Sequence, residues 1–284
     1  MNLESTFEGI IANAERRSKD LNDVNDDVYI KDGLKYCKRC NTARQTVISL
    51  FGKEKTVHCI CKCQKEALDK EEEDRKQREK LERISRLRSN GIHDVNIRNW
   101  TFENADDSHP KLMSLAKRYY TKWDEAHKNN IGLLFFGNVG TGKTYLAACI
   151  ANALINDGIP VLMTNFTKLI NDLSGFKEDD KNAYINSLNN YELLIIDDLG
   201  VERQSDYALE QVFNVIDGRY KNGQPLIVTT NLSVEDLKNP SDMKFKRIYD
   251  RILEMTIPVK VDGVSRREQL HKDKLQLARE LFAE

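Results

Sequence analysis

Eight consecutive residues combine glycines, a lysine and a hydroxyl group at a spacing that suits phosphate chemistry. They are Gly137, Asn138, Val139, Gly140, Thr141, Gly142, Lys143 and Thr144. Glycines let several backbone N–H groups point at one anion, and a following helix adds its positive N-terminal end. The spacing predicts a P-loop in which Lys143 reaches the β- and γ-phosphates and Thr144 ligates Mg²⁺.

The flanks of this loop have the context that a P-loop needs. An apolar run (131–136) precedes it, and an alanine-rich run (145–151) follows it. The two patterns predict a buried strand and a helix. A glycine-rich turn with an incidental lysine is the plain alternative, and the matching flanks argue against it.

A second candidate strand ends in two carboxylates. Four apolar residues (193–196) lead directly into Asp197 and Asp198. This is the Walker B pattern, typical of a strand buried on both faces. Asp197 would hold Mg²⁺, and Asp198 stands where many ATPases carry the group that polarises the attacking water. A simple cap at a strand end is the alternative.

Another apolar run (226–230) predicts a further buried strand, and Asn231 follows it. This is the sheet edge where a nucleotide would lie. Asn231 would orient the water nucleophile and sense the γ-phosphate. Capping of the next helix, at Ser233, is the alternative for this asparagine.

Two pairs of arginines follow in the last forty residues of the chain. Arg247 and Arg251 lie four residues apart on one face of a predicted helix, and Arg266 and Arg267 precede a terminal helix. Arginine suits a developing phosphoryl charge because its planar group stays protonated. A surface ion pair is the alternative for each.

Five of the six cysteines lie between positions 37 and 63. Two predicted hairpins, one turning at Asp32–Gly33 and one at 52–54, bring the ends of this stretch together. Cys37 and Cys40 form a first knuckle for Zn²⁺. The second knuckle offers His58, Cys59, Cys61 and Cys63 for two places. We favour Cys61 and Cys63, with Cys59 as the spare, in a structural zinc site. Unrelated thiols are the alternative.

The net charge of −1 excludes a general basic field for nucleic acid, so any DNA contact needs a local patch. No run approaches a membrane span, and the start of the chain lacks a secretory pattern. Clustered cysteines without a secretory signal favour a reducing cytoplasm. We predict an N-terminal zinc-binding domain (1–63), a charged helical linker (64–94) and an ATPase domain (95–284).

Four further segments complete the prediction. Residues 3–17 have amphipathic helical spacing, for packing on their own domain or in a partner's groove. The linker helix is polar on all sides until Leu81, Ile84 and Leu87 restore one apolar stripe for docking, and Asn90–Gly91 stops it. A helix spans 110–128. Just before it, Trp100 or Phe102 either stacks on adenine or packs in the core.

Together these motifs resemble the AAA+ class of P-loop ATPases, and residues 95–270 resemble the DnaC/DnaI/IstB-like ATPases. The resemblance is carried by Gly137–Thr144, by 193–200, which ends in Asp-Asp-Leu-Gly, by Thr229-Thr230-Asn231, and by the helix from Arg247 to Arg251. It implies an α/β fold with a five-stranded parallel sheet between helices, preceded by a small zinc-ribbon-like domain.

The resemblance also implies roles for single residues. Arg251 looks like an arginine finger for a neighbouring subunit's ATP, with Arg247 as its near partner and Arg266 or Arg267 as a second sensor. Asp198 replaces the glutamate of some members, so hydrolysis is expected to be slow, and Glu202 is a possible stand-in base.

A zinc-stabilised front domain on such an ATPase looks like the primosomal helicase loaders of bacteria and their phages. The resemblance implies that the N-terminal domain binds the replicative helicase and that the ATPase domain self-associates and binds single-stranded DNA. Two other readings stay open. One is an IstB-like transposition helper ATPase, and the other is a zinc-ribbon nucleic-acid-binding adaptor whose ATPase domain is inactive.

Overall fold

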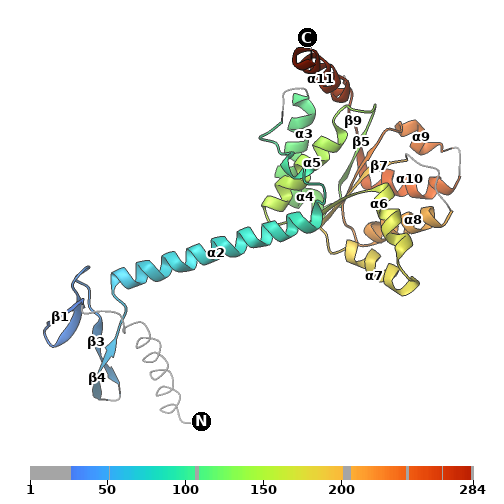
Figure 1. Ribbon diagram of the computed structural model, residues 1–284. Coiled ribbons are helices and arrows are strands. Elements are labelled where there is room, and N and C mark those ends of the chain that lie inside the picture. Colours follow the sequence, from blue (N-terminus) through green and yellow to red (C-terminus); the bar gives the residue numbers. More distant parts are fainter. Residues whose placement is uncertain are drawn as a thin grey trace. The chain divides into compact units, whose positions relative to one another are not determined.

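The computed structural model describes residues 27–50, 52–105, 109–200, 206–240, 243–263 and 265–282 (Figure 1). The predicted helix at 3–17 and the stand-in base Glu202 lie outside these ranges. The chain divides into two compact units, residues 1–80 and 81–284. Among the described helices, none combines the length and the apolar character needed to cross a membrane.

The N-terminal unit contains the two predicted hairpins. Strands β1 (Val28–Lys31) and β2 (Leu34–Cys37) pair antiparallel around Asp32–Gly33, where both residues have positive φ. Strands β3 (Gln45–Leu50) and β4 (Lys53–His58) form the second hairpin. Its turn was predicted at 52–54 and lies earlier, because Lys53 already pairs with Leu50 across the ladder.

Helix α2 (Lys62–Gly91) confirms the long charged helix. Its surface carries i,i+4 ion pairs such as Lys76–Glu72, at 2.8 Å. Ile84 and Leu87 pack against the core of the second unit. The prediction that Leu81 shares this contact is wrong, since the core contacts begin only at Ile84 and Leu81 is 66% exposed.

The second unit is built on a sheet of five strands in the order β6-β7-β8-β5-β9, with every pair parallel. The strands are β5 (Gly132–Phe136), β6 (Val161–Asn165), β7 (Leu193–Leu199), β8 (Leu226–Thr230) and β9 (Thr256–Lys260). This confirms the predicted five-stranded parallel sheet. All five strands run the same way, so the loops after them gather at one edge.

Helices cover both faces of this sheet (Figure 1). They are η1 (Ile97–Asn99, a 3₁₀ turn), α3 (Pro110–Thr121), α4 (Trp123–Lys128), α5 (Lys143–Asn156), α6 (Phe166–Gly175), α7 (Glu178–Leu188), α8 (Asp206–Lys221), α9 (Val234–Lys238) and α10 (Met243–Met255). Helix α11 (Arg266–Phe282) contributes no described side chain to either core. The single helix predicted over 110–128 breaks at Lys122, whose backbone leaves the helical region. The break lets Trp123 turn into the core.

The apolar side chains of β5, β6, β7 and β8 alternate between two cores. Leu133 and Phe135 face the core formed with α3, α4 and α5, whereas Leu134 faces the core formed with α6, α8 and α10. This two-sided burial explains why the strands read as unbroken apolar runs in the sequence.

The end of α2 lies directly against the edge strand β6. The sequence predicted that Asn90–Gly91 stops the helix, and Gly91 is its last residue. A Cβ atom on Gly91 would lie 2.0 Å from the Val161 carbonyl oxygen, so only glycine permits this approach. The next residue, Ile92, then forms a parallel bridge with Met163.

Arg219 in α8 is fully buried, and nothing in the sequence pattern marked it. Its guanidinium donates to four backbone carbonyls and to the Gln224 side chain. The carbonyls belong to Leu188 at the end of α7 and to Tyr191, Glu192 and Pro225 on the loops before β7 and β8. Burial lowers the pKa of Arg219 to about 10. The side chain therefore ties together two loops at the amino ends of neighbouring strands.

Arg219→Leu is expected to destabilise the second unit by about 3–5 kcal/mol, because it leaves several buried carbonyls without a donor. Chemical denaturation of both proteins measures this difference. Lys221→Ala on the same helix, whose side chain is exposed, is the matched control and should stay within about 0.5 kcal/mol. A denaturation midpoint for Arg219→Leu equal to that of wild type would contradict the stabilising role of Arg219.

Candidate active site and metal centre

The P-loop connects β5 to α5 as predicted, and Lys143 folds back over it. The Lys143 Nζ donates to the carbonyl oxygens of Gly137, at 2.9 Å, and Asn138, at 2.7 Å. Burial lowers the pKa of Lys143, and the carboxylates of Asp198 and Asp197 oppose that effect. The ammonium group is thus held within the loop that would surround a phosphate.

Gly140 shows why the loop needs glycine. Its φ is +82°, and a Cβ atom there would lie 2.2 Å from Ser265 Oγ. The Gly140 carbonyl accepts a hydrogen bond from the Arg266 N–H, at 3.0 Å. The segment that begins α11 is therefore bonded directly to the P-loop.

Thr144 and Asp197 meet as a magnesium site requires. The Thr144 hydroxyl donates to Asp197 Oδ1 at 2.9 Å, which leaves the hydroxyl lone pairs for a cation. Burial raises the pKa of Asp197, and hydrogen bonds from Thr229 and Thr144 oppose this. A hydroxyl beside a carboxylate is a hard oxygen donor set, which fits Mg²⁺.

A cavity of about 550 Å³ opens beside these groups. Its lining combines P-loop residues with polar groups from distant parts of the chain. The lining residues are Trp100, Val139, Gly140, Gly142, Lys143, Thr144, Tyr145, Asp198, Asn231, Arg266 and Arg267. Asp198, Asn231 and the second arginine pair thus share one cavity with the P-loop.

Asn231 does not cap the following helix. Ser233 does so, because its hydroxyl accepts from the Asp236 N–H and the Asp236 side chain accepts from the Ser233 N–H. The alternative role for Asn231 as a cap is therefore not supported. Its position in the lining of the cavity leaves it available to a ligand there.

Two aromatic rings form one wall of the cavity. Trp100 and Tyr145 lie 5.5 Å apart between ring centroids, and the Arg266 guanidinium lies 5.6 Å from the Tyr145 centroid. Phe102 packs on Tyr120, at 6.0 Å, and both Phe102 and Trp100 pack against the core. Of Trp100 and Phe102, Trp100 is the residue that lines the cavity. Tyr145 was not predicted, because its apolar neighbours read simply as a helix.

The first arginine pair lies elsewhere. Arg247 in α10 stacks over the Phe213 ring, at 4.3 Å from its centroid. Arg251 pairs with Asp217 at 3.5 Å and Glu254 at 3.3 Å, and it stacks over Tyr220 at 4.1 Å. Neither arginine is among the lining residues of the cavity.

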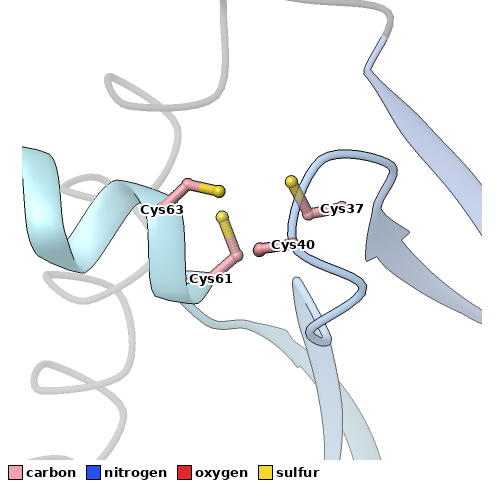
Figure 2. Close-up of side chains that lie close together, drawn as sticks. All are labelled: Cys37, Cys40, Cys61 and Cys63. Carbon is pink, nitrogen blue, oxygen red and sulfur yellow. The ribbon is translucent and has the colours of Figure 1, made fainter.

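In the N-terminal unit, the sulfur atoms of four cysteines lie within one small volume. Figure 2 shows the four side chains close together. Cys37 and Cys40 come from the end of β2 and the turn after it. Cys61 directly precedes α2, and Cys63 lies in its first turn. All four Sγ atoms lie within 4.8 Å of one another. Tetrahedral Zn²⁺ with bonds of ~2.3 Å would need sulfurs roughly 3.8 Å apart, so the set fits zinc closely.

Local hydrogen bonds bear on the charge of these thiols. A hydrogen bond with the Thr42 side chain lowers the pKa of Cys40 to about 5, and sharing a hydrogen bond with Cys40 raises the pKa of Cys63 to about 11. The Cys59 Sγ donates instead to the Ala43 carbonyl, at 3.3 Å. The four-cysteine set predicted for zinc is thus the set that the fold brings together, with Cys59 outside it.

Residues 52–274 match the family described as IstB-like ATP binding protein. The chain belongs to this family. The match confirms the resemblance to the DnaC/DnaI/IstB-like ATPases and covers the P-loop, the Walker B strand and both arginine pairs. The first cysteine pair, Cys37 and Cys40, lies before the matched region.

Individual relatives of this IstB-like protein are replication proteins by name. It is 28% identical over 180 residues to the replicative helicase loader DnaC of Buchnera aphidicola subsp. Schizaphis graminum, over 61% of this chain and 70% of the relative. It is 25% identical over 181 residues to the replicative helicase loader DnaI of Bacillus subtilis, over 59% and 58% respectively.

The fold of the IstB-like unit is also that of solved loader structures. A crystal structure of DnaI superposes with a TM-score of 0.53 and 25% identity over 64% of this chain and all of that one. A crystal structure of the DnaC helicase loader gives the same TM-score at 24% identity and shows the shared fold. These similarities confirm the AAA+ type of P-loop fold.

Proposed function

We propose that this chain is an ATP-driven loader of a replicative DNA helicase. The main support is the combination of an IstB-like ATP-binding unit, similar to DnaC and DnaI, with a four-cysteine unit ahead of it. In this proposal residues 1–63 bind the helicase, 64–94 form a charged linker, and 95–284 bind ATP. The ATPase unit self-associates and holds single-stranded DNA.

Hydrolysis is assigned to groups around the cavity. Lys143 and the loop N–H groups bind the β- and γ-phosphates. Thr144 and Asp197 would hold Mg²⁺, which would neutralise charge on the phosphates. Asp198 accepts the proton of the attacking water, and Asn231 orients that water. Arg266 and Arg267 contact the phosphates from the start of α11. The alternative base, Glu202, is tested by comparing Asp198→Asn with Glu202→Gln.

In this proposal the ATP site of a single subunit lacks a finger arginine. A finger arginine stabilises the charge on the transferred phosphoryl group, and Arg251 is the candidate. Because Arg251 contacts α8 and lies outside the lining of its own cavity, it would serve the ATP of a neighbouring subunit. ATP would then connect subunits, and its hydrolysis would release the assembly from the helicase.

Lys143→Ala is expected to weaken ATP binding by about 3 kcal/mol, or roughly 100-fold, since it removes charged hydrogen bonds to the phosphates. Equilibrium binding of a fluorescent ATP analogue measures this loss. Lys122→Ala is the matched control because Lys122 is exposed and pairs only locally with Glu125 in the described contacts. Wild-type affinity in Lys143→Ala would refute the assigned P-loop.

Capture of the replicative helicase from the same cell by the tagged protein tests the partner. We expect a complex in the presence of ATP, and its loss when residues 1–63 are deleted. Failure to bind helicase, together with binding of duplex DNA and a transposase, would favour the transposition helper. An inactive adaptor would show no ATP turnover even when saturated with helicase and single-stranded DNA.

A further inference from the structure

The Walker B strand contains an irregularity at its two carboxylates. Ile196 of β7 pairs with Val228 of β8, and Leu199 pairs with Thr230. Two residues of β7, Asp197 and Asp198, therefore face the single residue Thr229. A bulge of this kind re-aims side chains and leaves part of the backbone ladder without its usual partners.

The Thr229 side chain bonds one of the backbone N–H groups at this bulge. Its hydroxyl donates to Asp197 Oδ1, and the same oxygen accepts from the Asp198 N–H at 3.0 Å. Thr229 is fully buried, so water does not compete for these bonds. One hydroxyl thus contacts both acidic residues of the site.

The backbone of Asp198 depends on this support. Its φ is +55°, in the left-handed region that few residues other than glycine adopt. In this conformation Asp198 borders the cavity while Asp197 turns toward Thr144. The two neighbouring carboxylates can therefore perform separate tasks.

We propose that Thr229 is the positioning residue of this site. Its hydroxyl fixes the Asp197 carboxylate for Mg²⁺ and holds Asp198 at the cavity. The inference rests on the proposed ATPase function. It adds that the metal affinity of the site is set by a side chain that contacts neither nucleotide nor metal.

Thr230, the next residue, provides a matched control. It is equally buried, and its hydroxyl donates to the Leu199 carbonyl at 2.7 Å and accepts from the Leu232 N–H at 3.1 Å. Both of these bonds go to the backbone. Thr230→Val therefore removes a buried hydroxyl from the same strand without touching the bond to Asp197.

The experiment is a Mg²⁺ titration of the binding of a fluorescent ATP analogue by wild type, Thr229→Val, Thr229→Ser and Thr230→Val. Thr229→Val should raise the half-saturating Mg²⁺ concentration by about 10–100-fold. Thr229→Ser keeps the hydroxyl and should stay within about 3-fold of wild type, as should Thr230→Val. If Thr229→Val does not fold, Thr229→Ala against Thr229→Ser makes the same comparison.

An unchanged Mg²⁺ requirement in the folded Thr229→Val or Thr229→Ala protein would overturn the proposal. So would equal loss in Thr229→Ser, since the side-chain shape would then matter rather than the hydroxyl. The titration measures nucleotide binding and does not require ATP hydrolysis. A wild-type protein that binds ATP with Mg²⁺ but never hydrolyses it would refute the proposed ATPase, and the titration would still decide the role of Thr229.

Discussion

Arg251→Ala is expected to lower the ATPase rate of the assembled protein by about 10³-fold, with ATP affinity nearly unchanged. The expectation follows from where the guanidinium lies. Arg251 pairs with Asp217 and Glu254 on the surface of α8 and α10, and its own cavity is lined by other residues. Removing it should leave the nucleotide pocket of the same subunit intact.

Mixing Arg251→Ala with Lys143→Ala tests whether the arginine acts between subunits. The first variant keeps a complete P-loop, and the second keeps the arginine. If the finger acts in trans, the mixture recovers hydrolysis in those interfaces that join an intact P-loop to an intact arginine. Steady-state phosphate release, measured over a range of mixing ratios, detects this recovery.

Lys221→Ala is the control for the Arg251 prediction, because Lys221 also pairs with Asp217, at 2.7 Å. It should keep the wild-type rate if loss of the ion pair alone has no effect. Full activity in Arg251→Ala would show that this arginine serves only as a surface ion pair. Loss in Arg251→Ala without recovery on mixing would contradict action in trans.

Removal of zinc is expected to unfold the N-terminal unit and abolish helicase binding. The described part of this unit consists of two short hairpins and the start of α2, with Cys37 and Cys61 among its few fully buried side chains. So small a core does not stabilise a fold without additional ligands. Structural zinc contributes about 10–16 kcal/mol in small zinc-finger peptides, so its loss should be decisive.

Metal analysis should find about one zinc per chain in wild type and much less in Cys61→Ser. Cys59→Ser is the matched control, because Cys59 bonds to the Ala43 carbonyl and lies outside the four-cysteine set. It should retain zinc and helicase binding. Nucleotide binding by the second unit should survive in both variants. Zinc-free wild-type protein with an intact helicase complex would refute the metal centre.

Most of the sheet and the nucleotide site could be read from the sequence, and there are physical reasons for this. Strands buried on both faces leave unbroken apolar runs, and parallel strands bring Asp198 and Asn231 to one edge. Hairpin signals at Asp32–Gly33 and near Gly52 predicted that the two cysteine knuckles come together, but they did not distinguish Cys59 from Cys61 and Cys63. These features depend on local sequence patterns, namely apolar runs and turn residues.

Features that depend on contacts between distant segments could not be predicted. Arg219 satisfies carbonyls on two loops, Thr229 supports a bulge in a neighbouring strand, and Tyr145 borders the cavity from inside an apolar helix. Each has an ordinary sequence context. The wrong prediction that Leu81 packs against the core has a related origin. Helical spacing predicts which side chains share one face of α2, but it does not predict where the packed core ends.

The most direct test of the account is transfer of the replicative helicase onto circular single-stranded DNA, which has no end to thread. Helicase and circular DNA are mixed with ATP and either wild-type or Lys143→Ala protein. The helicase bound to the circles is then measured after gel filtration. We predict that wild-type protein increases the bound helicase several-fold and that Lys143→Ala does not. Equal amounts of bound helicase with and without the wild-type protein would contradict a loader function.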